Sequence, residues 1–136
     1  MVIATWSSDD LRRVGSSDEL QISARRTDGN LSPWLPIWVV CVGEQVYVRT
    51  WYRRATGWFA QVLDSRRASI RVPGLQADVA VEDAAGRRRL QADIDAAYVT
   101  KYPRYGTPTV GRMVTAAAAA TTLRLDPECE CCLAAH

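Results

Sequence analysis

One short segment of the chain gathers several side chains that can move a proton. It contains Asp93, Asp95, Tyr98, Tyr102 and Tyr105. The last four follow a spacing of i, i+3, i+7 and i+10, so a helix would place them on one face. An apolar wall beside that face would raise the pKa of the Asp95 carboxyl group and let it exchange protons near neutral pH, with Tyr98 as hydrogen-bond donor.

The same spacing has a second interpretation. Asp93 and Asp95 also suit the first turns of a helix, where carboxylates offset the positive end of the helix dipole. The tyrosines would then pack their rings and leave their hydroxyls in water. We therefore assign Asp93, Asp95, Tyr98 and Tyr102 as candidate catalytic residues, with this structural alternative left open.

The rarity of His and Lys limits the chemistry further. The chain has 136 residues, and its single His is His136 at the end, while its single Lys is Lys101. Because a Ser-His-Asp triad or a His-rich catalytic zinc site needs an imidazole held inside the fold, both are excluded from the domain. Proton transfer there must use carboxylates, phenols, Cys41 or a bound cofactor.

Charge patterning argues against nucleic acid as a partner. Arg residues occur in pairs such as Arg12-Arg13 and Arg66-Arg67, each close to acids, and the net charge is only +2. A nucleic-acid binder would concentrate unbalanced positive charge on one face. The first residues lack the pattern of a secretory signal, and no run of 18 apolar residues occurs, so we predict a cytoplasmic protein without a membrane partner.

Aromatic residues are candidates for binding a planar small molecule. There are five Trp in the chain, and Trp34 precedes Leu35-Pro36 in what reads as a loop rather than on a periodic face. A loop aromatic can stack on a ligand or pack beneath the loop. We name Trp34, Trp38 and Tyr105 as candidate substrate-binding residues.

The end of the chain reads as an appended tail, residues 128–136, after a domain of residues 6–127. The tail holds Cys129, Cys131, Cys132 and His136. This spacing lacks the paired arrangement of structural zinc sites, so we predict a flexible tail and no functional metal site.

Hydrophobic periodicity predicts an α+β domain with mostly short antiparallel strands. Helices are expected at 9–14, at 55–65, for about four turns from residue 90, and after Pro108. Strands are expected at 20–24, 37–42, 46–50, 70–72, 77–81 and 121–125. Tight links at Gly43-Glu44-Gln45 and Pro73-Gly74 join neighbouring strands. About six strands then form a small barrel with helices covering its ends.

Several segments together resemble a known bacterial family. They are Ile37-Trp38-Val39-Val40, Val46-Tyr47-Val48-Arg49-Thr50, Gly57-Trp58-Phe59, residues 93–102 and residues 120–125. In this order they resemble the family DUF2255, over roughly residues 6–127. The resemblance implies a fold related to the FMN-binding split β-barrel, the group that includes pyridoxamine-phosphate-oxidase-like and deazaflavin-dependent nitroreductase-like proteins. It carries no general activity.

The resemblance also implies where a cofactor would bind. In split-barrel flavoproteins, cationic and hydroxyl side chains at the end of a barrel strand hold the cofactor phosphate. Arg49-Thr50 is the matching position, with Lys101 as a further cation, and Trp51 or Trp58 would stack on the ring system of FMN or a deazaflavin. The alternative is that Arg49 and Thr50 form an ordinary outward pair on a sheet face.

Three functions follow from these observations. The first is a homodimeric flavin- or deazaflavin-dependent oxidoreductase acting on a small organic substrate. The second is a cofactor-independent enzyme of specialised metabolism, which uses carboxylate and phenol groups for a condensation or ring closure on an aromatic small molecule. The third is a ligand-binding domain without catalysis.

Overall fold

The chain folds into three helices and seven short strands within its described part. The computed structural model describes residues 6–17, 19–25, 30–49, 57–102 and 120–127. In chain order the elements are α1 (Ser8–Ser16), β1 (Leu20–Ala24), β2 (Leu35–Ile37), β3 (Val39–Val42), β4 (Gln45–Val48), α2 (Gly57–Ser65), β5 (Arg67–Val72), β6 (Leu75–Asp83), α3 (Arg88–Lys101) and β7 (Leu123–Pro127). The predicted helix after Pro108 and the tail 128–136 lie outside the described residues.

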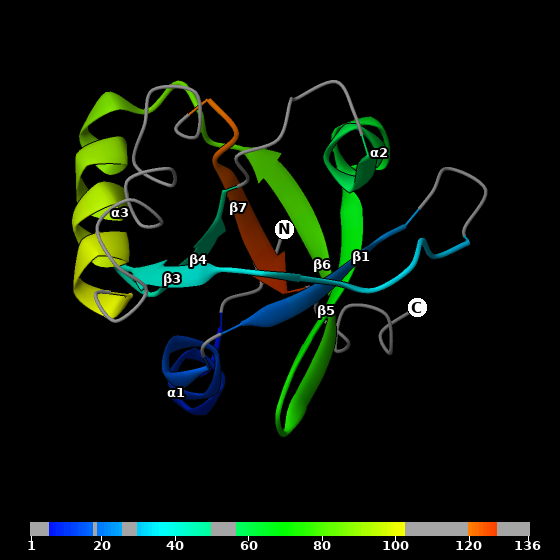
Figure 1. Cartoon of the computed structure of the whole chain (residues 1–136), viewed down its shortest axis with the longest axis horizontal. Coiled ribbons are helices and arrows are strands. Elements are labelled where there is room, and N and C mark those ends of the chain that lie inside the picture. The colour runs from blue at the N-terminus through cyan, green and yellow to red at the C-terminus, as the bar shows by residue number, and fades with distance from the viewer. Residues whose placement is uncertain (1–5, 18, 26–29, 50–56, 103–119, 128–136) are drawn as a thin grey trace, which may run out of the picture.

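The strands form one antiparallel sheet that curls into a nearly closed barrel (Figure 1). Their order is β2-β1-β5-β6-β7-β4-β3. The two edge strands, β2 and β3, are consecutive in the chain and are separated by Trp38 alone. The chain therefore passes directly from one edge of the sheet to the other, and this passage brings the two edges together. The predicted antiparallel split barrel is confirmed.

The prediction missed one strand. Leu35–Ile37 was expected to be partly loop and partly the start of a longer strand, but it forms the separate strand β2 against β1. Pro36 is compatible with this strand because β2 lies at the edge of the sheet, where a missing backbone N–H costs no ladder hydrogen bond. The strand expected at 121–125 lies at Leu123–Pro127.

Apolar side chains fill the inside of the barrel. Strand alternation turns one side of each strand inward, and the inward residues Leu20, Ile22, Val46, Val48, Ile70, Val79, Leu123 and Leu125 are fully buried. Val14 of α1 and Val62 of α2 join the same core, and Figure 1 shows these two helices near opposite ends of the strands. Among the described residues the barrel interior is therefore packed core.

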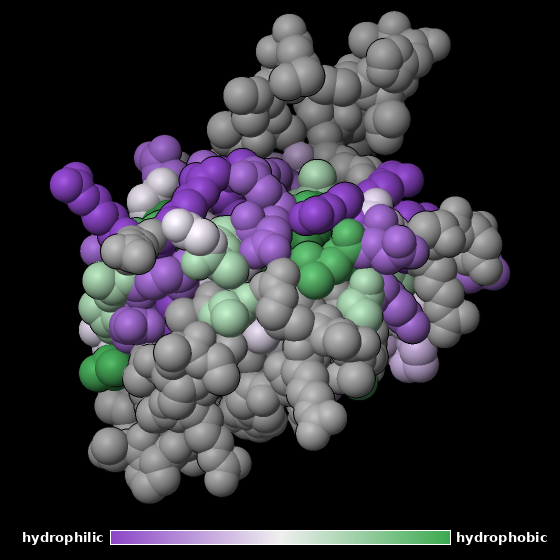
Figure 2. Space-filling model, turned by 90° about the horizontal axis from the view of Figure 1, so that it is seen from above, coloured by the Kyte–Doolittle hydropathy of each residue, from purple (hydrophilic) through white to green (hydrophobic). Residues whose placement is uncertain are grey.

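Helix α3 lies on the outer surface of β3 and β4. Its Ile94 and Tyr98, with Tyr102 directly after the helix, form a second apolar cluster with Val40 and Tyr47, which point outward from those strands. The helix stripe predicted from the sequence thus covers the side of the barrel and not its mouth. Figure 2 shows that the rest of the described surface in that view is mostly hydrophilic, with hydrophobic residues in small separate patches.

Two tight turns carry left-handed backbone. Gly43 and Glu44 link Val42 to Gln45 with φ values of 54° and 68°, which is the pattern of a type I′ hairpin turn. At the second turn Gly74 has φ of 84° between Pro73 and Leu75. Gly is well suited to such positions, whereas the Cβ of Glu44 makes this conformation unfavourable.

We predict that Glu44→Gly raises the free energy of unfolding by up to about 1 kcal/mol. A side chain in the left-handed region costs roughly 1–2 kcal/mol, and Gly returns roughly 0.5–1 kcal/mol of that as backbone entropy in the unfolded chain. Urea denaturation measures the change. The control is Gln45→Gly, one residue later in β4, which should lower stability by roughly 0.5–1 kcal/mol. Equal effects of both variants would contradict the strained turn.

Candidate functional site

Arg49 is a fully enclosed arginine where β4 ends. Its side chain has 0% exposure, and its guanidinium lies beneath α3. Nη1 forms an ion pair with Asp95 Oδ1 at 2.5 Å, Nε donates to Thr122 Oγ1 at 2.9 Å, and Nη2 donates to Gln91 Oε1 at 2.6 Å. A buried charge is stable only when it is paired and hydrogen-bonded, and this network supplies both conditions.

Helix α3 positions the partners of Arg49. Gln91 and Asp95 are four residues apart, so both side chains lie on the face that looks toward the end of β4. Gln91 is fixed in turn, because its Nε2 donates to the carbonyl of Ala84 at 2.7 Å and its Oε1 accepts from the Thr122 hydroxyl at 2.8 Å. Asp95 retains 40% exposure. The carboxylate that neutralises Arg49 is thus also open to solvent.

Side chains at the C-terminal end of α3 hydrogen-bond to the backbone where the chain passes from β2 to β3. The Tyr102 hydroxyl accepts from the Val39 N–H at 3.1 Å and donates to the Val39 carbonyl at 3.0 Å. Lys101 Nζ donates to the Val39 carbonyl at 2.7 Å and to the Val14 carbonyl at 3.4 Å. The Tyr98 hydroxyl donates to the Trp38 carbonyl at 3.4 Å. These residues supply hydrogen bonds where the chain crosses between the sheet edges.

Aromatic packing closes the same region. The rings of Trp38 and Tyr102 are parallel within 3°, with centroids 4.2 Å apart. Tyr98 is fully buried beside Tyr102, and burial, reinforced by Tyr102 and partly offset by the Arg49 cation, raises the pKa of the Tyr98 phenol far above its ordinary value. Tyr98 is therefore a hydrogen-bond donor and not a proton acceptor near neutral pH.

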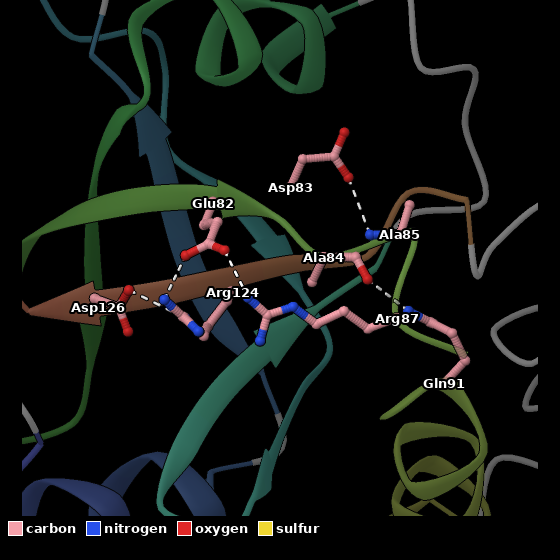
Figure 3. Close-up of polar contacts among 8 residues, drawn as sticks. All are labelled: Glu82, Asp83, Ala84, Ala85, Arg87, Gln91, Arg124 and Asp126. Carbon is pink, nitrogen blue, oxygen red and sulfur yellow. Dashed lines mark hydrogen bonds and ion pairs between the residues drawn. The ribbon is translucent and has the colours of Figure 1, made fainter. Parts of the chain in front are cut away.

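A second polar network continues along the outer surface of β6 and β7 (Figure 3). Arg124 on β7 pairs with Glu82 on β6 and, at 3.1 Å, with Asp126. Arg87 Nη2 reaches the other oxygen of Glu82 at 2.8 Å. In this view Gln91 donates to the Ala84 carbonyl, next to the turn where the Ala85 N–H donates to Asp83 at 3.0 Å. A polar strip thus runs from Asp126 to the Arg49 network.

The structure brings some of the predicted site residues together and separates others. Asp95 and Arg49, which were assigned to different roles, form one ion pair. Tyr98 and Tyr102 have buried hydroxyls, which corrects the alternative that leaves them in water. Asp93 is exposed on α3. Thr50, Trp51 and Tyr105 lie outside the described residues, as does the side chain of Trp58.

Several residues of the site were missed by reasoning from the sequence. Gln91 and Thr122 complete the Arg49 network, and Glu82 and Arg124 form its extension. The only sequence signal for Gln91 was its i, i+4 spacing to Asp95. The pairing of Glu82 with Arg124 depends on the register between β6 and β7, which sequence spacing does not provide.

The two cations predicted to hold a cofactor phosphate do not fit that role in this arrangement. Arg49 directs its donors at Asp95, Gln91 and Thr122, and Lys101 directs its ammonium group at two backbone carbonyls. A phosphate would have to displace Asp95 to reach Arg49. Among the described residues no cluster of three His, Cys, Asp or Glu side chains could hold a metal ion. Within this part of the chain, none of the helices has the length and apolar character needed to cross a membrane.

Comparison with a family model decides the relationship. The model of DUF2255, described as "Uncharacterized protein conserved in bacteria", matches residues 10–125. The chain belongs to the DUF2255 family. Among curated proteins none matches this DUF2255 member.

Solved structures similar to this DUF2255 protein have low sequence identity to it. A FAD-binding protein from Mesorhizobium loti is 14% identical, with a TM-score of 0.57 and 95% of each chain covered. A heme storage protein from Vibrio cholerae is 11% identical, with a TM-score of 0.61, covering 89% of this chain and 87% of that one. A protein named F420 reductase is 14% identical, with a TM-score of 0.52, covering 87% and 92%. At these identities the likeness shows the fold.

We predict that Arg49→Met and Asp95→Asn each lower the free energy of unfolding by about 2–4 kcal/mol. Each change leaves a buried charge or its polar partners uncompensated. The double variant should lose at least about 1 kcal/mol less than the sum, because the two residues share one interaction. Urea denaturation measures the cycle. Asp93→Asn, an exposed carboxylate on the same helix, should change stability by less than about 0.5 kcal/mol. Simple additivity would contradict the coupling.

We also predict that Tyr102→Phe lowers the free energy of unfolding by about 1–3 kcal/mol, since the buried N–H of Val39 loses its hydroxyl acceptor. The stacked ring remains, so the variant isolates the hydroxyl. Tyr47→Phe is the matched comparison, because Tyr47 is also a buried tyrosine but its hydroxyl forms no hydrogen bond within the described part of the chain, and it should change stability by less than about 0.5 kcal/mol. Thermal unfolding of both variants gives the order. An equal or larger loss for Tyr47→Phe would contradict this assignment.

Proposed function

We propose that this protein binds a flavin or deazaflavin on the outer surface of its barrel and acts as an oxidoreductase on a small organic substrate. The observation that supports an outer site is the packed barrel interior, which leaves no room for a tricyclic ring among the described inward-facing side chains. Fold relatives named as a FAD-binding protein and as F420 reductase support this class of cofactor.

The outer surface of β1 and β5 offers side chains suited to an anionic cofactor. Arg25 and Arg67 both point outward, because the neighbouring residues Ala24 and Ala68 are buried on the inner side. Ser69 and Asp78 lie in the next row of the same surface, joined by a hydrogen bond of 2.5 Å, and Asp78 forms an ion pair with Arg25 at 3.3 Å. This surface differs from the one on which α3 packs, because α3 lies on β3 and β4, at the opposite edge of the sheet from β1.

Titration with FMN, FAD and F420, followed by fluorescence quenching, tests the proposal. We expect saturable binding of at least one of them. If Arg67 holds a phosphate, FMN should bind at least about tenfold more tightly than riboflavin. Arg67→Gln should then reduce the preference for FMN over riboflavin. Arg89→Gln, which removes the same charge from an exposed position on α3, should retain that preference. Absence of saturable binding for all three cofactors would overturn the proposal.

Cofactor-independent acid–base chemistry at Asp95 is the second candidate. The observation that favours it is that Asp95 pairs with Arg49 through one oxygen while 40% of its side chain stays exposed. A substrate could therefore approach the carboxylate from solvent. Activity without added cofactor that Asp95→Asn abolishes, and Asp93→Asn leaves unchanged, would favour this candidate over the flavin enzyme.

A further inference from the structure

A groove on the outer surface holds Arg71, whose terminal nitrogens form no hydrogen bond or ion pair with another residue in the described part of the chain. Sheet register places Pro36, Gln21, Arg71 and Gln76 in one row across β2, β1, β5 and β6. These residues line a groove of about 610 Å³ together with Glu19, Val72 and the turn Pro73–Leu75. This volume is in the range of small-molecule sites. The groove lies away from Arg49 and uses none of its partners.

The guanidinium of Arg71 is held in a fixed orientation. Its Nε donates to Gln21 Oε1 at 2.5 Å, and its Cζ lies 4.2 Å from the ring centroid of Trp34. Stacking on an indole together with one hydrogen bond fixes the plane of the group. No acidic side chain in the described part of the chain forms an ion pair with Arg71, so its two terminal nitrogens remain available as a fork.

The walls of the groove suit a ligand with an apolar body. Pro36 and Leu75 provide hydrocarbon surface, while Gln76 adds an amide directly across from Arg71. One wall is fixed by Arg13, whose Nη1 donates to the carbonyl of Gly74 at 3.1 Å. Glu19 is the acidic residue among the lining side chains, and its negative charge makes the groove less attractive to an anion than Arg71 alone would.

From these contacts we infer that the groove binds a small-molecule carboxylate, with the Arg71 fork on the carboxylate and the apolar walls against the ligand body. A planar guanidinium matches the two oxygens of a carboxylate in a bidentate pair. Trp34, the loop aromatic singled out in the sequence, acts through Arg71 as a positioning residue. This site is independent of flavin binding.

The test is an NMR titration of the full chain with benzoate, with benzyl alcohol as a neutral ligand of similar shape and inorganic phosphate as a competing anion. Benzoate should bind at least about tenfold more tightly than benzyl alcohol, and more tightly than phosphate. Equal binding of benzoate and benzyl alcohol would overturn the inference, and stronger binding of phosphate would overturn the choice of carboxylate.

Variants assign the effect to the groove. Arg71→Gln should weaken benzoate binding about tenfold or more. Arg71→Lys, which keeps the charge without the fork, should bind benzoate with an affinity between those of the wild type and Arg71→Gln. Glu19→Gln should tighten binding, because it removes a negative charge that repels the carboxylate of benzoate. Arg89→Gln on α3 is the matched control and should bind benzoate as the wild type does. Unchanged binding in Arg71→Gln, with unchanged thermal unfolding, would overturn the site, whatever the result with flavins.

Discussion

The passage of the chain from β2 to β3 through Trp38 is the constraint on which the other parts of the structure depend. Because these strands are the two edges of one curled sheet, backbone groups at Trp38 and Val39 lack a neighbouring strand on one side. Buried backbone groups must find other partners. Helix α3 supplies them through Tyr98, Lys101 and Tyr102, and its position on the barrel follows from that requirement.

Placing α3 there determines where polar chemistry is located. The helix encloses Arg49 and brings Asp95 and Gln91 onto its guanidinium, so charged groups that a sequence reading assigns to cofactor binding become internal partners. The inside of the barrel is meanwhile filled by aliphatic side chains. The described outer surface, by contrast, carries charged side chains on strands outside the α3 contact, among them Arg67 and Arg71 on β5 and Arg124 on β7.

The fold was largely predictable because its strands alternate and its turns carry clear signals. Leu20, Ile22 and Ala24 marked β1, and Pro73-Gly74 marked the β5–β6 turn. The separate strand β2 was missed, since Pro36 disfavours a strand everywhere except at an edge, and edge position is a property of the whole sheet. Pairing of Glu82 with Arg124 was missed because cross-strand register depends on contacts distant in sequence.

By itself, the sequence determined the family through the resemblance of several segments to it, predicted the antiparallel barrel from hydrophobic periodicity, and showed by composition that residues 6–127 contain no imidazole. It also placed Asp95, Tyr98 and Tyr102 on one helix face. The tertiary structure decided what those residues do. The buried phenols of Tyr98 and Tyr102 hydrogen-bond to backbone groups. Asp95 forms an ion pair with Arg49, since a buried cation needs a nearby anion. It also placed Trp34 on Arg71, a contact that no local pattern contains.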